Sequence, residues 1–161
     1  MLTGMAKEYT IRPATWGDLA PMKDLLPELA DFDIPPKRAS EDLWQGDAQL
    51  LEEALQGNAE NTFAHVAVAQ DGRIVGLTLI TMRDELMSHK PSAHLEAIVV
   101  SPTSRGTGLG RSLLAHAEEA VMQRGARSLS LHVFAANHRA RGLYNAEGFD
   151  AELIRAIKWF D

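Results

Sequence analysis

The chain has 161 residues, of which 45% are apolar and 24% charged, and its formal net charge is −6. This size predicts one domain over residues 1–161, with a single substantial core spanning about 8–160. No apolar stretch is long enough for a membrane-spanning helix and no basic start leads into one, so we expect a cytoplasmic protein that binds no membrane.

The absence of cysteine excludes disulfides, thiolate zinc sites and a covalent intermediate on a cysteine nucleophile, and no metal is expected. Residues 1–60 carry 5 basic and 12 acidic side chains, whereas residues 61–161 carry 11 and 10. With no clustered basic face, nucleic acid is not expected as a partner. The acidic first part is either a solvated surface or a region that attracts cations.

The first half of the chain predicts a strand, two helices and a hairpin. Residues 8–13 alternate as a strand does, and Thr15 with Asp18 forms a cap-like start for a helix that carries apolar residues up to Leu29. A second helix opens at Ser40 and runs to Leu55. Two β-type runs, 63–69 and 73–81, are joined by Asp-Gly, which indicates an antiparallel hairpin.

The second half predicts three more strands and two helices. A strand over 94–100 ends at Pro102, and the apolar spacing from 108 to 124 is that of an amphipathic helix. A strand over 128–134, a short helix over 137–146 and a last strand over 149–160 follow. The expected order is β, α, α, β, β, β, α, β, α, β.

A glycine-rich run, Arg105-Gly106-Thr107-Gly108-Leu109-Gly110, joins the strand over 94–100 to the amphipathic helix. Free backbone N–H groups at a helix start, together with the helix dipole, favour an anion such as phosphate. The dinucleotide fingerprint would need glycine at Arg111, and the Walker A loop would need glycine at Arg105 and lysine at Arg111. Neither of these nucleotide-binding loops fits.

The pattern Arg105-x-x-Gly108-x-Gly110 resembles the signature of the GCN5-related N-acetyltransferase (GNAT) family. The resemblance continues downstream at Asn137, Ala140, Tyr144, Gly148 and Phe149. It implies an α/β (α+β) fold, in which a single mixed, mostly antiparallel twisted sheet with a splayed parallel strand pair is flanked by helices. It also implies an enzyme that moves the acetyl group from acetyl-CoA directly to a primary amine in a ternary complex. A small amine, an amino sugar, a polyamine or a peptide or protein amino group would be the acceptor.

The resemblance assigns the coenzyme A contacts residue by residue. The amides of residues 106–110 would hold the pyrophosphate, Arg105 and Arg111 would help to neutralise it, and the pantetheine arm would lie between the two splayed strands. The residues implied in cofactor binding are Ile98, Val99, Val100, Arg105, Gly106, Thr107, Gly108, Leu109, Gly110, Arg111, Asn137 and Arg139.

An amine must lose its proton before it attacks a thioester, and an alkylamine has a pKa of ~10.4, so a general base is useful. The resemblance points to Glu96, within an otherwise apolar strand, acting directly or through water; the alternative is a glutamate held by a neighbouring group. His94 and His132 are weaker candidates. Tyr144 would protonate the departing thiolate, a role that the family assigns to this position, or else pack in the core with its hydroxyl bonded. The N–H near Val99 would stabilise the oxyanion.

The parts of the chain that would bind the amine acceptor carry the fewest recognisable sequence motifs. Residues 24–45, 82–93 and 150–160 correspond to it by resemblance, and the acidic and aromatic residues Asp31, Asp33, Glu41, Asp42, Phe32 and Trp44 form our hypothesis for a cationic amine. The competing function is a binding module that senses acyl-CoA without turnover. A homodimer is compatible with the apolar run from Leu153 to Phe160, which is either core or interface.

Overall fold

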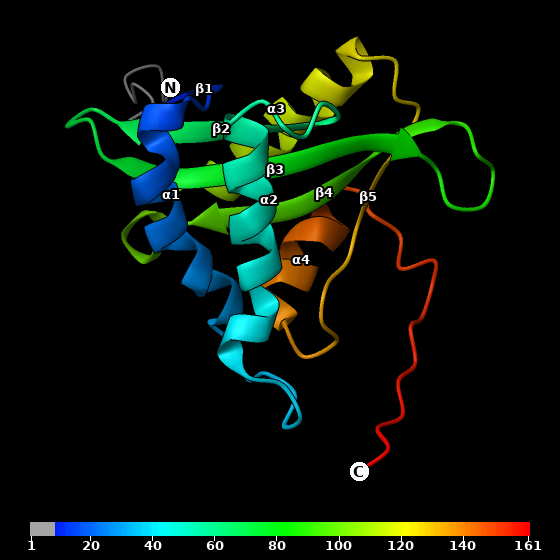
Figure 1. The fold of residues 1–161 in the computed structure, drawn as a ribbon. Coiled ribbons are helices and arrows are strands. Elements are labelled where there is room, and N and C mark those ends of the chain that lie inside the picture. The colour runs from blue at the N-terminus through cyan, green and yellow to red at the C-terminus, as the bar shows by residue number, and fades with distance from the viewer. Residues whose placement is uncertain (1–8) are drawn as a thin grey trace, which may run out of the picture.

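The computed structural model describes residues 9–161, which form a five-stranded sheet in the order β1-β2-β3-β4-β5 (Figure 1). The first four strands pair antiparallel and β4 pairs with β5 in parallel. This arrangement confirms the predicted mixed, mostly antiparallel sheet. The strands are β1 (Tyr9–Pro13), β2 (Thr62–Ala69), β3 (Ile74–Asp84), β4 (Pro91–Val100) and β5 (Leu129–Leu131). Glu8, with which the first strand was predicted to begin, lies outside the described residues.

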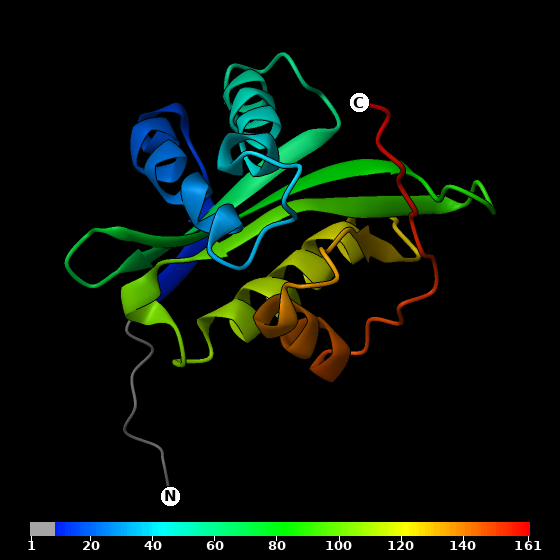
Figure 2. The same cartoon turned by 90° about the horizontal axis from the view of Figure 1, so that it is seen from below.

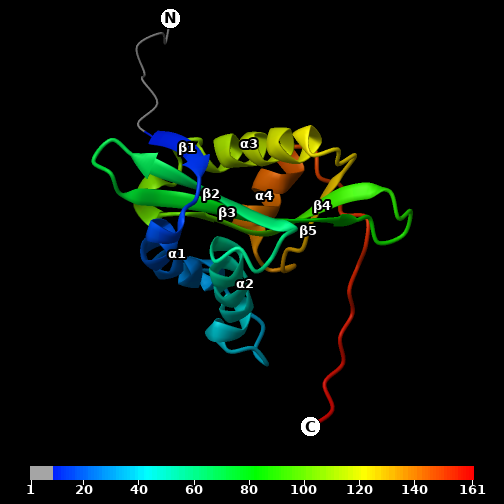
Figure 3. The ribbon, with the colours of Figure 1, turned by 45° about the horizontal axis from the view of Figure 1, so that its top comes forward.

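Two helices cover each face of the sheet (Figures 2 and 3). On one face lie α1 (Leu19–Leu25), extended by a 3-10 turn over Leu26–Ala30, and α2 (Gln45–Leu55), preceded by a 3-10 turn over Ser40–Leu43. The other face carries α3 (Leu109–Gln123) and α4 (His138–Ala146). Asn137 begins α4 as predicted, because its side chain accepts a hydrogen bond from the Ala140 N–H.

The sheet therefore separates two apolar layers. Met22, Leu26 and Leu51 are fully buried against one face of β2, β3 and β4. On the other face Leu113, Leu114 and Val121 of α3 are buried to a similar degree. Each such side chain contributes about 1.5–3 kcal/mol by leaving water, which makes these stripes the main force that orients the helices.

Close packing of α3 on the sheet depends on Gly76 in β3. A Cβ atom at this position would lie 3.0 Å from Leu113 Cδ1 and 3.1 Å from the Val99 carbonyl oxygen. Because real Cβ atoms rarely come so close to backbone oxygen, glycine at position 76 sets how deeply α3 sits, and the end of the glycine-rich run forms the first residues of α3.

Strand β4 is irregular at Glu96. Ala97 lies opposite Leu79 and Leu95 lies opposite Ile80, so Glu96 is an extra residue without a partner in β3. Such a bulge turns the alternation of side chains by one step. Leu95 consequently packs with the α3 layer, whereas Ala97 and Val99 pack with the α1–α2 layer.

The parallel pair β4–β5 parts directly beside this bulge. Pairing is confined to Ala93, His94 and Leu95 of β4, opposite residues 129–131. From Glu96 onward, that edge of β4 has no strand beside it among the described residues. The predicted splayed pair is confirmed, although β5 is shorter than the predicted strand over 128–134.

The predicted last strand over 149–160 is wrong, because residues 150–161 run extended without pairing to the sheet (Figure 1). Ile154 and Phe160 are 90% and 87% exposed, so this segment does not join the core. Its contacts include an ion pair and a cation–π contact: Lys37 Nζ lies 2.7 Å from Asp161, and the Arg38 guanidinium lies over the Trp159 ring. With only three residues in β5, little of a neighbouring edge is available for pairing.

No helix within residues 9–161 combines the length and the apolar composition needed to cross a membrane.

Candidate functional site

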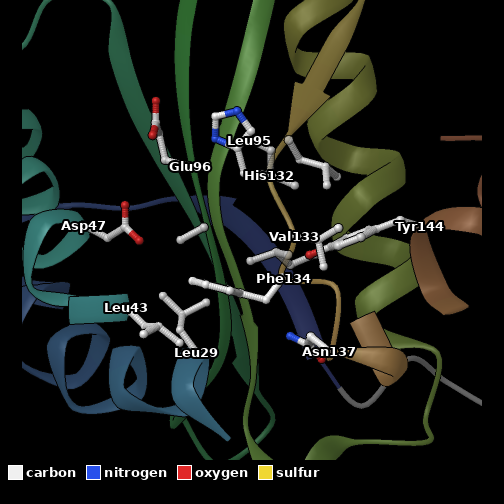
Figure 4. A pocket seen from close by; sticks show the side chains of 13 residues that line it. Leu29, Leu43, Asp47, Leu95, Glu96, His132, Val133, Phe134, Asn137 and Tyr144 are labelled. Carbon is white, nitrogen blue, oxygen red and sulfur yellow. The ribbon is translucent and has the colours of Figure 1, made fainter. Parts of the chain in front are cut away.

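Two cavities meet where β4 and β5 part. The loop cavity, of about 280 Å³, lies over the glycine-rich run, between the end of β4 and α4. The carboxylate cavity, of about 200 Å³, lies between α2, the bulge of β4 and the segment that follows β5 (Figure 4). Residues that line both are Leu29, Ile98, Asn137 and Tyr144. A ligand in one cavity can therefore reach the other at the parting of the strands.

The glycine-rich run directs its backbone N–H groups away from protein acceptors. Gly106 and Gly108 have φ angles of 76° and 85°, which glycine adopts without steric cost, and Gly108 precedes the first residue of α3. Within residues 9–161, no hydrogen bond joins the N–H groups of residues 106–111 to a protein acceptor. Together with the positive end of the α3 dipole, these donors form an anion site.

Three arginines stand at the loop cavity, and each pairs with an acidic group of the chain. Arg105 contacts Asp31 at 2.6 Å and Glu28 at 3.2 Å. Its hydrogen bond is the main cause of the lowered pKa of the Asp31 carboxyl. Arg139 lies 3.8 Å from the same Asp31. Arg111 Nε donates to Glu147 at 2.6 Å.

The backbone of β4 presents Ile98 and Val100 to the parting. The Ser101 N–H donates to the Val75 carbonyl on β3. Because backbone groups alternate in direction along a strand, the N–H of Val99 also points to β3, and those of Ile98 and Val100 point the other way. Val99, which was predicted to bind the pantetheine and to offer the oxyanion N–H, borders the loop cavity but directs that N–H into the sheet.

Two carboxyl groups line the carboxylate cavity, Glu96 from the β4 bulge and Asp47 from the first turn of α2 (Figure 4). Burial, with the nearby Glu96 charge as a second cause, raises the pKa of Asp47 to about 7. Neither carboxyl has a hydrogen-bond or ion-pair partner among residues 9–161. No lysine or arginine is among the residues that line this cavity.

The two histidines considered as bases lie together at the end of the strand pair. Their ring centroids are 4.6 Å apart, and His94 Nδ1 is 2.8 Å from Ser130 Oγ. Burial lowers the pKa of His94 to about 4, which makes it a weak base at neutral pH. His132 lines the carboxylate cavity, whereas His94 does not.

Tyr144 stands across this cavity from the carboxyl groups, with its hydroxyl directed inward (Figure 4). It is half-buried on α4 and packs edge-on against Phe149. Burial raises the pKa of its hydroxyl to about 12, so the hydroxyl keeps its proton at neutral pH. Within the described chain its oxygen has no hydrogen-bond partner, in contrast to the alternative of a bonded core tyrosine.

The structure brings the predicted site residues together with few exceptions. Both predicted catalytic residues line the carboxylate cavity, and of the cofactor residues only Thr107 is not among the residues that line the loop cavity. The Thr107 hydroxyl donates instead to the Ser104 carbonyl at 2.6 Å, within the loop itself.

The acidic residues suggested for the acceptor are placed elsewhere. Asp31 is paired with Arg105, and Asp42 accepts from the Ala39 N–H at 2.9 Å. None of the six suggested residues lines either cavity, although Phe32 packs against the lining residue Phe134 with 5.6 Å between the ring centroids. Asp47 was not predicted as a site residue. Its position as an acidic residue between apolar positions of α2 was the one signal in the sequence.

Among residues 9–161, no group of three or more histidine or acidic side chains is arranged to hold a metal ion.

Comparisons with known proteins agree with this geometry. A family model described as Acetyltransferase (GNAT) family matches residues 25–149. Thialysine N-epsilon-acetyltransferase of Bos taurus is 30% identical over 160 residues, which cover 92% of this chain and 88% of the bovine protein. A Bacillus subtilis protein, provisionally named a ribosomal protein bS18-alanine N-acetyltransferase, is 35% identical over 105 residues. That match covers 63% of this chain and 64% of the relative, just under two thirds of its length.

Among solved structures, aminoglycoside N-acetyltransferase AAC(6')-Iy in complex with CoA superimposes with a TM-score of 0.71 at 21% identity, covering 99% of both chains. This likeness confirms the fold. Because the family model spans residues 25–149 and the bovine relative aligns over nearly the whole length, the chain belongs to the GNAT family of acetyltransferases.

Proposed function

We propose that this protein transfers the acetyl group of acetyl-CoA directly to a primary amine, with both substrates bound at once. The observation that carries the proposal is the meeting of the two cavities at Ile98 and Tyr144. A donor in the loop cavity and an amine in the carboxylate cavity would touch at the parting of β4 and β5. Holding two reactants in this way removes much of the entropic barrier of a bimolecular step.

Residues 105–111 fit the pyrophosphate of coenzyme A. The free N–H groups of this run would bind its oxygens, and Arg105, Arg111 and Arg139 lie close enough to the loop to add positive charge. Arg105 would exchange part of its contact with Glu28 and Asp31 for phosphate, since all three side chains are at least partly open to solvent.

Backbone groups of Ile98 and Val100 would hold the pantetheine arm as a neighbouring strand would. The Ile98 N–H lies at the junction of the cavities, so we assign it, rather than the Val99 N–H, to the oxyanion formed when the amine attacks. The side chain of Ile98 is part of the apolar packing around α3 and can vary among apolar residues.

Glu96 is the proposed general base. The bulge directs its carboxyl into the carboxylate cavity, where no arginine or lysine neutralises it. Tyr144 faces it from α4 and would donate a hydrogen bond to the sulfur as the thiolate leaves. A thiol has a pKa of ~8.5, so a hydroxyl whose pKa is about 12 stabilises the sulfur charge by its hydrogen bond more readily than by giving up its proton.

The acceptor is proposed as a compact primary amine or an amine at the end of a longer molecule. The relatives' names include thialysine and the alanine of a ribosomal protein as acceptors of those proteins. An amine carrying positive charge suits a cavity whose titratable residues include two carboxyl groups.

The test is release of free thiol from acetyl-CoA with a panel of spermidine, lysine, an alanyl tripeptide and kanamycin. The chain has no cysteine, so thiol reagents report coenzyme A without protein background. We expect turnover with at least one amine, and a loss of about 10²-fold or more in kcat for Glu96→Gln and Tyr144→Phe. Coenzyme A binding by calorimetry should stay unchanged in both variants. Binding of acetyl-CoA with no turnover on any amine would instead favour the acyl-CoA-sensing module.

A further inference from the structure

Asp47 is a carboxyl group whose place in the fold has no structural explanation. It lies in the first turn of α2, in the wall of the carboxylate cavity, on the same side as Glu96 and opposite Tyr144 (Figure 4). A helix start tolerates an acidic residue, but the burial of this carboxyl outweighs that benefit and disfavours its charge.

The groups around Asp47 offer it no compensation. Leu29 and Leu43, from the two 3-10 turns beside α1 and α2, and Phe134, from the segment after β5, form the apolar part of the wall. The titratable groups that line the cavity with it are Glu96, His132 and Tyr144. Two acidic groups beside a tyrosine, with no arginine or lysine among the lining residues, leave a net preference for a cation inside this cavity.

We propose that Asp47 and Glu96 act as a carboxyl pair that binds the protonated amine of the acceptor and takes a proton from it before the attack. This inference rests on the proposed acetyltransferase function. It adds a second acidic residue to the base and names the charged form of the amine as the species that enters the cavity.

The proton balance of the reaction gives this pair one proton to accept. An ammonium nitrogen carries three protons and the amide product carries one, so two leave the nitrogen. The first passes to the pair, which frees the nitrogen lone pair to form the bond to the acetyl carbon. When the carbon–sulfur bond breaks, the second proton leaves the nitrogen and one proton finally reaches the thiolate. The other proton stays on the pair, in place of the one that the pair gives up to water when the ammonium binds, and this restores the starting state.

Charge repulsion between the two carboxyls suits this task. Two acidic groups that share a site do not both ionise readily, so one keeps its proton close to neutral pH. An arriving ammonium favours the doubly ionised pair and is held by it. The pair can then accept a proton from the ammonium with little change in the total charge of the cavity.

The test compares Asp47→Asn with Glu53→Gln, a matched removal of an acidic charge on the same helix outside both cavities. For Asp47→Asn we expect kcat/KM for the amine to fall by about tenfold to a hundredfold. The KM for acetyl-CoA and the affinity for coenzyme A should stay within about twofold of the parent, whereas Glu53→Gln should change neither. Asp47→Glu should recover part of the loss.

A second measurement does not need turnover. The carboxyl carbon of Asp47, followed by NMR in the coenzyme A complex, should titrate near neutral pH, and at lower pH in Glu96→Gln. Butylammonium chloride should shift that titration downward in the parent. Unchanged amine kinetics in Asp47→Asn, or a carboxyl signal indifferent to both Glu96→Gln and butylammonium, would overturn the inference. If the protein acetylates none of the amines but butylammonium still shifts the signal, the proposed function fails while the cation site stands.

Discussion

Replacing Asp47 with asparagine should stabilise the protein at neutral and alkaline pH. The pKa of this carboxyl is raised from 3.8 to about 7 in the folded protein, so the folded state holds its proton more tightly than the unfolded state. Stability should therefore fall as the pH rises from about 4 to about 7, because the folded protein must ionise a carboxyl in an unfavourable place. Asparagine has no such ionisation.

The shift sets the size of the effect. A difference of about three pK units corresponds to a change of at most about 4 kcal/mol in the free energy of unfolding. Because the carboxyl retains some contact with solvent, we expect about 1–3 kcal/mol at pH 8. At pH 4 or below, where the aspartic acid is neutral in both states, the gain should disappear.

Urea unfolding of the parent, Asp47→Asn and Glu53→Gln at pH 4 and pH 8 measures this difference directly. The control should follow the parent at both values. A destabilised Asp47→Asn at pH 8 would refute the reasoning, since it would mean that Asp47 holds the fold together. An equal change at pH 4 and pH 8 would refute it as well, because the effect would then not depend on ionisation of the carboxyl. A variant that is more stable and less active would instead mark Asp47 as a residue kept for function.

Three further substitutions test the packing and the ion pairing of the fold. Asp18→Asn should lower the free energy of unfolding by about 2 kcal/mol at pH 7, because the hydrogen bonds of Asp18 to Arg12 lower the pKa of this carboxyl to about 2. Measured as a function of pH, the loss should vanish between about pH 4 and pH 2, where the parent loses the same charge. Gly108→Ala should lower the free energy of unfolding by about 1–2 kcal/mol because of the φ angle of 85°, since nothing lies within 4 Å of a Cβ at this position. A denaturant midpoint equal to that of the parent would contradict this. Gly76→Ala should cost about 1–3 kcal/mol in the same assay because its Cβ would press on Leu113 and the Val99 carbonyl, and a neutral result would mean that α3 shifts freely.

Local patterns in the sequence were sufficient for much of the fold. The apolar spacing before Gln123 predicted α3 nearly to the residue, and the Asp71-Gly72 turn predicted the β2–β3 hairpin. Each of these patterns depends on neighbours a few residues apart, which is why a single sequence can reveal it. The glycine-rich turn before α3 was predictable for the same reason, while its role in binding coenzyme A stays a prediction.

What the sequence did not reveal depends on contacts between distant segments. Asp47 and Glu96 are 49 positions apart, and nothing local to α2 indicates that its first turn will face a bulge in β4. Arg105 was expected to serve phosphate, but its pairing with Glu28 and Asp31 joins two segments over 70 residues apart. The run over 149–160 has the composition of a strand, yet pairing requires a neighbouring edge, which composition cannot supply.

The extra residue in β4 also limits how this protein can vary in length. Removing Glu96 would restore regular alternation, and every side chain on one side of the deletion would then turn to the opposite layer. Either Ala97 and Val99 or Leu95 and Ala93 would leave the apolar layer in which they now pack. A deletion here therefore removes the β4 side chains from one of the two apolar layers, whereas the loops at residues 31–39 and 85–90 can gain or lose residues without disturbing either layer.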